Sequence, residues 1–362
     1  MMSAFSTLTT IAWRRSPGSA SARTAPRAVR DRLATAIPWL ALLAACAPVA
    51  PATHAPSVSF EPVTFFAIAD PQINIPRWGT AGTEQTIELL NTLPGEPFPF
   101  GGVVGEPVGV IAAGDLVDDM SNPDNWALYK TFFDPEGNAK LRFPMFDGQG
   151  NHDVDVRDQP FGTFNATQLE FIERNRRRPG SFVFDEHDYH YSWEWAGVRF
   201  IQLNIFPGVA HRPVYNGEAV GNDPKNSLGF LRFVLEQHVA DSGQPIIAIW
   251  HYGLRGWGRE MWWLEEDLDS LQAVLDGYNV LLLLHGHEHR YERYTWRGYD
   301  VIMAPSPQYD RDPEQPDTHS RPKGFLVFRI TSDELQMGYR TPDGWADAWS
   351  TPIARSAGVS AR

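Results

Sequence analysis

The chain has 362 residues, a length that suits one large domain or two small ones. Hydrophobic residues make up 43% of it and charged residues 21%, a balance typical of globular proteins. The formal net charge is −13, and no stripe of Lys and Arg is visible downstream of the N-terminal segment, which argues against a nucleic-acid backbone as the main partner. Small phosphorylated substrates are compatible with this acidity, because bound dications supply local positive charge.

The N-terminal segment has the composition of an export signal. Arg27, Arg30 and Arg32 precede a mostly apolar stretch that starts at Leu33 and closes with Leu-Ala-Ala before Cys46. The stretch is too short to span a bilayer, which needs about 20 apolar residues. A basic segment, a short apolar segment and small residues are typical of secretory signals. Cys46 is the single cysteine, so no intramolecular disulfide can form.

The residues that end at Cys46 resemble the lipobox of bacterial lipoproteins. In that class the cysteine is acylated and becomes the mature N-terminus. The resemblance implies an exported protein that a lipid holds on the periplasmic or cell-surface face of a bacterial membrane. The alternative is an ordinary signal peptide with a cysteine at its cleavage site. Residues 1–46 are thus the predicted signal region, and the Pro- and Ala-rich residues 47–59 are predicted to be an extended tether.

From residue 60 onward the pattern alternates between strands and helices. Apolar runs typical of strands buried on both faces cover 63–69, 108–113, 245–250 and 280–284. Helices are predicted over 83–93, 122–130, 166–178 and 228–239. Two hairpins are predicted around 196–197 and 297–298, and further strands over 143–146, 325–330 and 335–339. We predict one domain over 60–350 and a loose tail over 351–362.

Metal-type ligands follow five of the short apolar runs. The five segments are Asp70-Pro71-Gln72, Gly114-Asp115-Leu116-Val117-Asp118, Gly150-Asn151-His152-Asp153, His251, and Gly286-His287-Glu288-His289. A polar residue right after a buried strand lies at its carboxyl end, where α/β folds build their sites. We therefore expect the five segments to converge on one rim. Oxygen and imidazole ligands without thiolates suit Mn²⁺, Fe or Zn²⁺, and seven of them suit two ions that share a bridge.

In this order the segments resemble the motifs of the calcineurin-like metallophosphoesterase family, over about residues 60–340. The resemblance implies a metal-dependent hydrolase of phosphoric esters, acting on monoesters or diesters. It implies an α/β fold that is a four-layer αββα sandwich, in which helices flank two mixed β-sheets. It also implies two divalent metal ions and a small phosphorylated substrate.

The resemblance also implies a role for each motif residue. The implied ligands are Asp70, Gln72 and His289 for the first metal, Asn151, His251 and His287 for the second, and Asp115 as the bridge. A hydroxide between the metals would attack phosphorus. His152 would protonate the leaving alkoxide. Asp118 would either orient that imidazole or only cap a turn.

The sequence departs from the family pattern at two positions. Gln72 stands where most of the family has His, and its amide oxygen is a weaker and harder donor than an imidazole nitrogen. We therefore expect a weaker first site, with a bias from Zn²⁺ toward Mn²⁺ or Fe. Asp119 stands where protein Ser/Thr phosphatases place an Arg that grips phosphate, which argues against that activity.

Three further residues are candidates for substrate contacts. Arg255 and Arg290, which closely follow His251 and His289, would bind phosphate or else be ordinary surface arginines. Trp257, flanked by glycines, is predicted to form an aromatic lip over the substrate, and either Trp262 or Trp263 is predicted to lie in the core.

Several functions stay open within this framework. Placement outside the cytoplasm favours nucleotides, sugar phosphates or phospholipid head groups as substrates. An inositol-phosphate or lipid phosphatase and a pyrophosphatase of activated sugars or lipids are alternatives. A non-catalytic binding protein that kept the fold is a further one, although such a protein has no need of the general acid His152.

Overall fold

A computed structural model describes the following residues: 60–74, 79–154, 166–187, 189–209, 214–215, 218–219, 224–256, 259–308 and 323–354. The predicted signal region with Cys46, the tether over 47–59 and Trp257 lie outside these residues. Within the described ranges, none of the helices has both the length and the apolar character needed to cross a membrane.

One sheet carries the first three strands of the chain. Across this sheet the order is β15 (Gly344–Pro352), β14 (Glu334–Thr341), β13 (Phe325–Ile330), β1 (Val63–Ile68), β2 (Pro107–Ala112) and β3 (Met145–Asp147). β1, β2 and β3 are parallel to one another, whereas β13, β14 and β15 pair in antiparallel fashion. The carboxyl ends of β1, β2 and β3 therefore meet at one edge of this sheet.

The other large sheet is built from the second half of the chain. Its order is β11 (Glu292–Trp296), β12 (Tyr299–Met303), β10 (Val280–His285), β9 (Ile246–Ile249), β6 (Val198–Gln202), β5 (Tyr191–Trp195) and β4 (Val183–Phe184). β6, β9, β10 and β12 are parallel, and β4–β5, β5–β6 and β11–β12 are antiparallel pairs. A small ribbon pairs β7 (Val214–Tyr215) with β8 (Glu218–Ala219).

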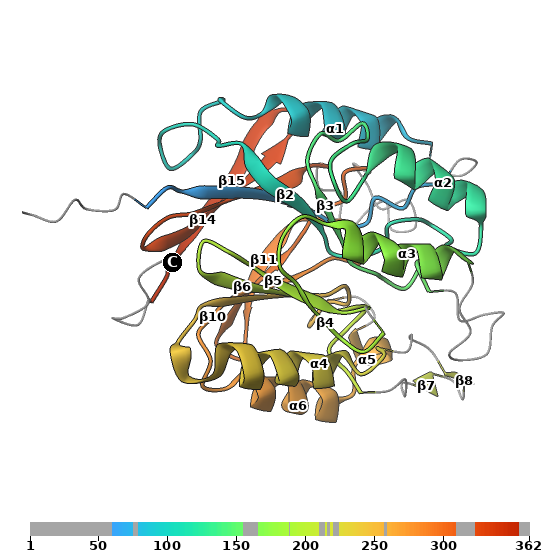
Figure 1. Cartoon of the computed structure of the whole chain (residues 1–362), viewed down its shortest axis with the longest axis vertical. Helices are drawn as coiled ribbons and strands as arrows, with labels where there is room; N and C mark the ends of the chain where they lie inside the picture. The colour runs from blue at the N-terminus through green and yellow to red at the C-terminus, as the bar shows by residue number, and fades with distance from the viewer. Residues whose placement is uncertain are drawn as a thin grey trace, which may run out of the picture. The chain divides into compact units, whose positions relative to one another are not determined.

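Helices cover the outer face of each large sheet (Figure 1). On the first sheet these are α1 (Ala81–Thr92), α2 (Pro123–Phe132) and α3 (Ala166–Arg177). On the second sheet they are α4 (Ser227–Val234), α5 (Arg259–Trp262) and α6 (Glu265–Leu275). The inner faces of the two sheets pack on each other, so the domain is the four-layer αββα sandwich of two mixed sheets that the family resemblance implied.

The strands are buried on both faces because each separates two layers of core. In β1, Phe65 and Ala67 point into the core between the sheets, whereas Phe66 and Ile68 point into the core beneath the helices. This is the two-residue alternation of a strand, with apolar partners on either side. Burying one such phenylalanine contributes about 1.5–3 kcal/mol.

Most of the predicted elements are present, but some ends differ, and further elements such as β4 and the ribbon of β7 and β8 are found only in the structure. The helix predicted over 228–239 is α-helical only to Val234, and Leu235–Val239 forms a π-helical turn. The predicted tail begins too early, because Thr351 and Pro352 belong to β15 and Ile353 is buried. Strand β15 lies at the sheet edge with most residues partly exposed, so its apolar pattern is too weak to be recognised from the sequence.

Candidate metal centre

The candidate ligands lie where five strands end. Asp70, Asp115 and Asn151 follow β1, β2 and β3 of one sheet, whereas His251 and His287 follow β9 and β10 of the other. Backbone hydrogen bonds join neighbouring segments of each sheet: Asp70 N donates to Gly114 O at 3.0 Å, and Gly286 N donates to His251 O at 3.1 Å. The predicted convergence on one rim is therefore present, and the rim belongs to both sheets.

Two groups of possible ligand atoms overlap at one carboxylate. Asp115, His251 and His287 form one group, and Asp70, Asp115 and His289 form the other, with the ligand atoms of each group within 4.8 Å of one another. Asp115 is the member that the groups share. Oxygen and imidazole donors at this spacing fit a pair of divalent metal ions.

The remaining two predicted ligands lie against these groups. Asn151 Oδ1 is 3.1 Å from His251 Nε2, and Gln72 Nε2 is 3.2 Å from Asp115 Oδ2. The structure thus brings all seven predicted ligands into one cluster. Rotation of the Gln72 amide would exchange its oxygen and nitrogen and turn the oxygen toward a bound ion.

The orientation of His251 presents one ring nitrogen to the cluster. Its Nδ1 lies 2.8 Å from the carbonyl oxygen of Ala113, a group that only accepts hydrogen bonds. Nδ1 therefore carries the proton, and Nε2 points toward Asp115 Oδ2 at 3.2 Å. A metal-binding histidine is commonly held in this way by a carbonyl behind it.

The buried charges of the cluster fit a bound cation. Asp70, Asp115 and His251 are almost fully buried. Burial raises the pKa of Asp70 well above its usual value, with the nearby Asp115 carboxylate adding to the rise. Burial lowers the pKa of His251, but the Asp115 carboxylate outweighs it and raises that pKa to about 9. The proton on His251 thus offsets part of the buried negative charge of Asp115. Bound dications would neutralise the same charge.

The glycines of the motifs leave room for the ligands. A Cβ atom on Gly150 would lie 2.2 Å from Asp115 Oδ1, and one on Gly286 would lie 2.5 Å from Ala69 Cβ and 2.9 Å from Asp70 Oδ2. Any side chain at either position would therefore displace a ligand or its strand. The glycines before Asn151 and His287 are explained by this close approach of backbone to side chain.

His152 lies at the edge of the cluster and is partly exposed. Its Nε2 is 4.0 Å from Asp115 Oδ2, and its Nδ1 is 2.7 Å from the carbonyl oxygen of Asp118. The Asp118 carboxylate is farther, at 3.6 Å, and accepts a hydrogen bond from Asn74. Burial lowers the pKa of His152, but Asp115 and the Asp118 carbonyl outweigh it and raise that pKa above its usual value. The carbonyl of Asp118 thus makes the close contact, and its carboxylate a longer one.

Asp153 joins two ligand-bearing loops, a role that the sequence analysis did not assign. Its buried carboxylate accepts hydrogen bonds from the backbone nitrogens of Leu116, Val117 and Gly150 at 2.8–3.1 Å. Burial, together with the Asp115 charge, raises the pKa of Asp153 to about 7 against these hydrogen bonds. Its place six residues after the end of β3 gave no signal for this role, because two of its three partners, Leu116 and Val117, follow another strand.

Ser306 supports Asp70 from the segment that follows β12, and no sequence motif pointed to it. Its hydroxyl donates to the backbone oxygen of Asp70 at 2.7 Å, next to a bond from Ala69 N to Pro305 O at 3.1 Å. The segment thus fixes the start of the first ligand loop.

Arg255 and Arg290 are both paired with glutamates. Arg255 Nη2 lies 2.7 Å from Glu292 Oε1, and Arg290 Nη2 lies 2.7 Å from Glu288 Oε2 and 3.1 Å from Glu292 Oε2. These ion pairs favour the alternative of structural arginines over phosphate contacts. They also tie the loop after β9 to the loop after β10.

The tryptophans after His251 have different environments. Trp263 is buried and donates from Nε1 to Gly253 O at 2.8 Å, so it is the core residue of the pair. Trp262 stacks on Tyr252 with ring centroids 4.7 Å apart and meets His287 edge-on at 5.5 Å. Trp262 therefore forms part of an aromatic wall beside the cluster, whereas the predicted lip residue Trp257 lies outside the described residues.

Comparisons with known proteins agree with this geometry. A model of the calcineurin-like phosphoesterase family matches residues 63–291. A comparison with curated protein sequences gives no match. Among solved structures, a dimetal phosphatase from Danio rerio is similar at 16% identity and a TM-score of 0.50, over 81% of this chain and 99% of that chain.

Two further solved structures share the fold. A purple acid phosphatase from seeds of yellow lupin, Lupinus luteus, is 15% identical with a TM-score of 0.54, over 80% of this chain and 53% of that chain. The anchor protein of the inner membrane complex of Plasmodium is 13% identical with a TM-score of 0.50, over 82% of this chain and 90% of that chain. At these identities the likeness concerns the fold alone.

Proposed function

Since this chain belongs to the calcineurin-like phosphoesterase family and is therefore a metal-dependent phosphoesterase, we propose that its seven clustered ligands form a dimetal active site with His152 as general acid. The observation that carries the proposal is the overlap of two ligand groups at Asp115. When bound, two dications would supply a water acidic enough to attack phosphorus and positive charge for the phosphoryl oxygens.

Asp115 is proposed to bridge the two ions, because it has two acceptor oxygens and belongs to both groups. Asp70, Gln72 and His289 are assigned to the first ion, and Asn151, His251 and His287 to the second. Gln72 would weaken the first site relative to an imidazole and favour Mn²⁺ or Fe over Zn²⁺.

His152 is proposed to give its proton to the leaving alkoxide. Its Nδ1 faces the Asp118 carbonyl at 2.7 Å and therefore keeps its proton, which leaves Nε2 to face the substrate. Asp115 and Asp118 both lie within 4.0 Å of the ring, and their negative charges favour the protonated imidazole that a general acid requires. Asp118 acts here as a positioning residue, mainly through its backbone.

Assays with p-nitrophenyl phosphate and bis-p-nitrophenyl phosphate test the function. We expect turnover that depends on Mn²⁺, is abolished by a chelator and returns when Mn²⁺ is restored. Asp115→Asn, purified in parallel, controls for phosphatases of the expression host. Absence of turnover with every dication, on monoesters, diesters and pyrophosphates, would favour a binding protein that kept the fold.

We also propose that the protein is exported and acylated at Cys46, on the sequence resemblance to the lipobox. Metabolic labelling with a clickable palmitate in a bacterial host should mark the wild type and not Cys46→Ser. Labelling of both, or of neither with the wild type secreted freely, would contradict the lipid anchor.

A further inference from the structure

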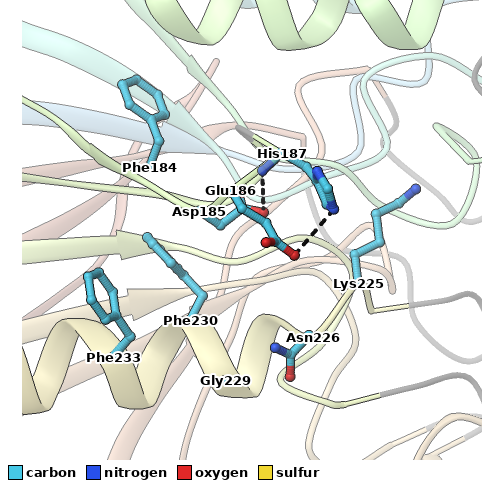
Figure 2. A pocket seen from close by; sticks show the side chains of 9 residues that line it. All are labelled: Phe184, Asp185, Glu186, His187, Lys225, Asn226, Gly229, Phe230 and Phe233. Atoms are coloured by element: carbon cyan, nitrogen blue, oxygen red, sulfur yellow. Dashed lines mark hydrogen bonds and ion pairs between the residues drawn. The ribbon is translucent and has the colours of Figure 1, made fainter.

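A pocket of about 370 Å³ opens between β4 and α4, apart from the ligand cluster. This volume lies within the range of small-molecule sites. Figure 2 shows the rings of Phe184, Phe230 and Phe233 together on one side of the pocket, with His187, Lys225 and Asn226 on the other. The pocket thus has an apolar end and a polar end.

The polar end faces the rim that carries the metal ligands. β4 and β6 both pair antiparallel with β5, so they run in the same direction, and β6 is parallel to β9. The end of β4 therefore lies at the same edge as His251, which follows β9. Three strand spacings separate β4 from β9, a distance of about 14 Å. His187 follows β4 beyond its end, and Lys225 precedes α4, so both lie near this edge.

The apolar end lies farther from the rim. Phe230 and Phe233 are in the first and second turns of α4, which runs away from the edge at which it begins. Phe233 is 45% exposed, one of five large hydrophobic side chains that stand out as exposed in the described part of the chain. An apolar ligand in the pocket would cover this ring.

A chain of buried hydrogen bonds connects the pocket wall to the ligand cluster. His190 Nε2 lies 3.0 Å from the Lys225 carbonyl, and its Nδ1 accepts from Asn204 N at 3.1 Å. Asn204 Oδ1 accepts in turn from Gln149 N at 3.0 Å, and Gln149 lies two residues before the ligand Asn151. Three hydrogen bonds thus link the pocket wall to the loop that carries Asn151.

The charged groups of the pocket already have partners. His187 Nε2 lies 3.3 Å from Glu186 Oε1, Asp185 accepts from the backbone of His187 and His190, and the Lys225 ammonium lies 4.2 Å from the centre of the Tyr189 ring. Apolar atoms nevertheless form slightly more than half of the lining surface, and Phe233 is the ring that a ligand would cover most. Contact with such rings favours a hydrocarbon group rather than a second phosphate.

We propose that this pocket binds an apolar hydrocarbon chain on the alcohol portion of the substrate, so that the preferred substrates are amphiphilic phosphoric esters. This inference rests on the proposed function, because it places the phosphorus at the ligand cluster and the chain end in the pocket, more than about 14 Å away. The part of the alcohol next to the phosphate would cross the polar rim between the ligand cluster and the pocket.

Substrate length is the test. With Mn²⁺ present, and below the critical micelle concentration, kcat/KM is compared for methyl phosphate and dodecyl phosphate, with p-nitrophenyl phosphate as a short reference. We expect the wild type to prefer dodecyl phosphate by at least about tenfold, the scale of a few methylene contacts in a pocket. Phe233→Ser should remove most of this preference and leave the p-nitrophenyl phosphate rate unchanged.

A matched control and a binding measurement separate the possible failures. Val103→Ser removes another exposed apolar side chain, 56% exposed and near the amino end of β2, and should keep the preference. Dodecylphosphonate, which is not hydrolysed, should bind the wild type about tenfold more tightly than it binds Phe233→Ser.

Turnover of p-nitrophenyl phosphate without any chain-length preference would overturn the pocket assignment and leave the proposed function intact. Equal loss of preference in Phe233→Ser and Val103→Ser would overturn it as well, since the effect would then be general adsorption. If no ester is turned over, the proposed function fails. Dodecylphosphonate binding that does not depend on Phe233 would then overturn the pocket, whereas dependence on Phe233 would support it as a site for amphiphilic phosphates.

Discussion

The backbone of the candidate ligands is strained. Asp70, Gln72, Asp115, His287 and His289 all have positive φ angles, between 38° and 87°, and they are five of eleven such non-glycine residues in the described chain. Each conformation of this kind costs of order 1–3 kcal/mol and persists only where the surroundings impose it. Five of these conformations occur in one cluster. This fits side chains that the backbone orients in advance for a pair of ions.

The roles of His152 and Asp115 are separable by mutation. His152→Ala should lower turnover by about 10²–10⁴-fold with the metal content unchanged, because a general acid is lost and no ligand is. Asp115→Asn should instead reduce the bound metal. Metal analysis of both purified variants, beside kcat, provides the measurement. A metal-free His152→Ala protein would show that the assignment of its imidazole is wrong.

Metal binding should release a proton from His251. Its pKa is raised to about 9 in the metal-free site, so at pH 7 its Nε2 holds a proton that a metal must displace. Metal affinity should therefore rise with pH up to about 9 and level off above it. Calorimetric titration of Mn²⁺ at pH 7, in buffers of different ionisation enthalpy, counts the released protons. A binding enthalpy independent of the buffer would contradict the protonated state.

Gly150 should be needed for the metal site rather than for the fold. In Gly150→Ala the new methyl group would lie 2.2 Å from Asp115 Oδ1, so we expect a loss of bound metal. Gly277→Ala is the control, because its φ of 89° strains the backbone while no atom lies within 4 Å of the added carbon. Both variants should lose stability, and Gly277→Ala should keep its metal. Full metal occupancy in Gly150→Ala would count against the close-approach explanation.

At the scale of elements, one buried carboxylate fixes helix α3 to strand β3. Asp147, at the end of β3, accepts hydrogen bonds from Arg174 on α3, from Arg178 just beyond it and from the Tyr129 hydroxyl on α2. All four side chains are buried. Three elements therefore depend on a single charge two residues before Gln149, at the edge that carries the metal ligands.

Asp147→Asn should destabilise the protein strongly. It leaves two buried guanidinium groups without their counter-charge, a change that costs about 3–5 kcal/mol. Arg177→Met is the matched control, because Arg177 pairs with Asp134 on the surface with half of its side chain exposed, where a pair contributes about 0–1 kcal/mol. Urea unfolding gives both free energies. If Asp147→Asn lowers the free energy of unfolding by less than about 1 kcal/mol, the two arginines do not need the charge of Asp147.

At the scale of the whole domain, the metal centre joins the two sheets at their common edge. Ligands from β1, β2 and β3 meet ligands from β9 and β10, and Asp115 lies 3.2 Å from His251 across this junction. Bound ions would thus add cross-links between layers that otherwise adhere through apolar packing.

Removal of the metals should therefore lower stability without unfolding the domain. Ions that bind only the folded state stabilise it by about 2.7 kcal/mol at a concentration of 100 Kd, which corresponds to a fall of about 5–10 °C in Tm on chelation. Hydrogen exchange should accelerate in the ligand loops and stay slow in β1 and β9, because each of these strands is buried between the inter-sheet core and a core beneath helices. An unchanged Tm and unchanged loop protection would indicate that the ions add no cross-link.

The primary structure alone was enough to predict the candidate ligands and their places along the chain. Apolar runs that end in Asp, Asn, Gln or His indicated both the buried strands and the candidate ligands at their carboxyl ends. Both signals come from residues that are close together in the sequence. The same local patterns gave four helices, α1 to α4, and the two hairpins to within a few residues. They missed β15, whose partly exposed edge position leaves little pattern to recognise.

How these residues meet depends on the packing of the sheets and helices, which the sequence pattern does not contain. The sharing of Asp115 by two groups, the support of Asp153 and Ser306, the pairing of Arg255 and Arg290 with glutamates and the pocket beside α4 all depend on the packing of elements on one another. Many of these contacts join residues that are far apart along the chain and come from different strands. The periodicity of apolar residues cannot predict such contacts, because they form only when the two sheets and their helices pack together.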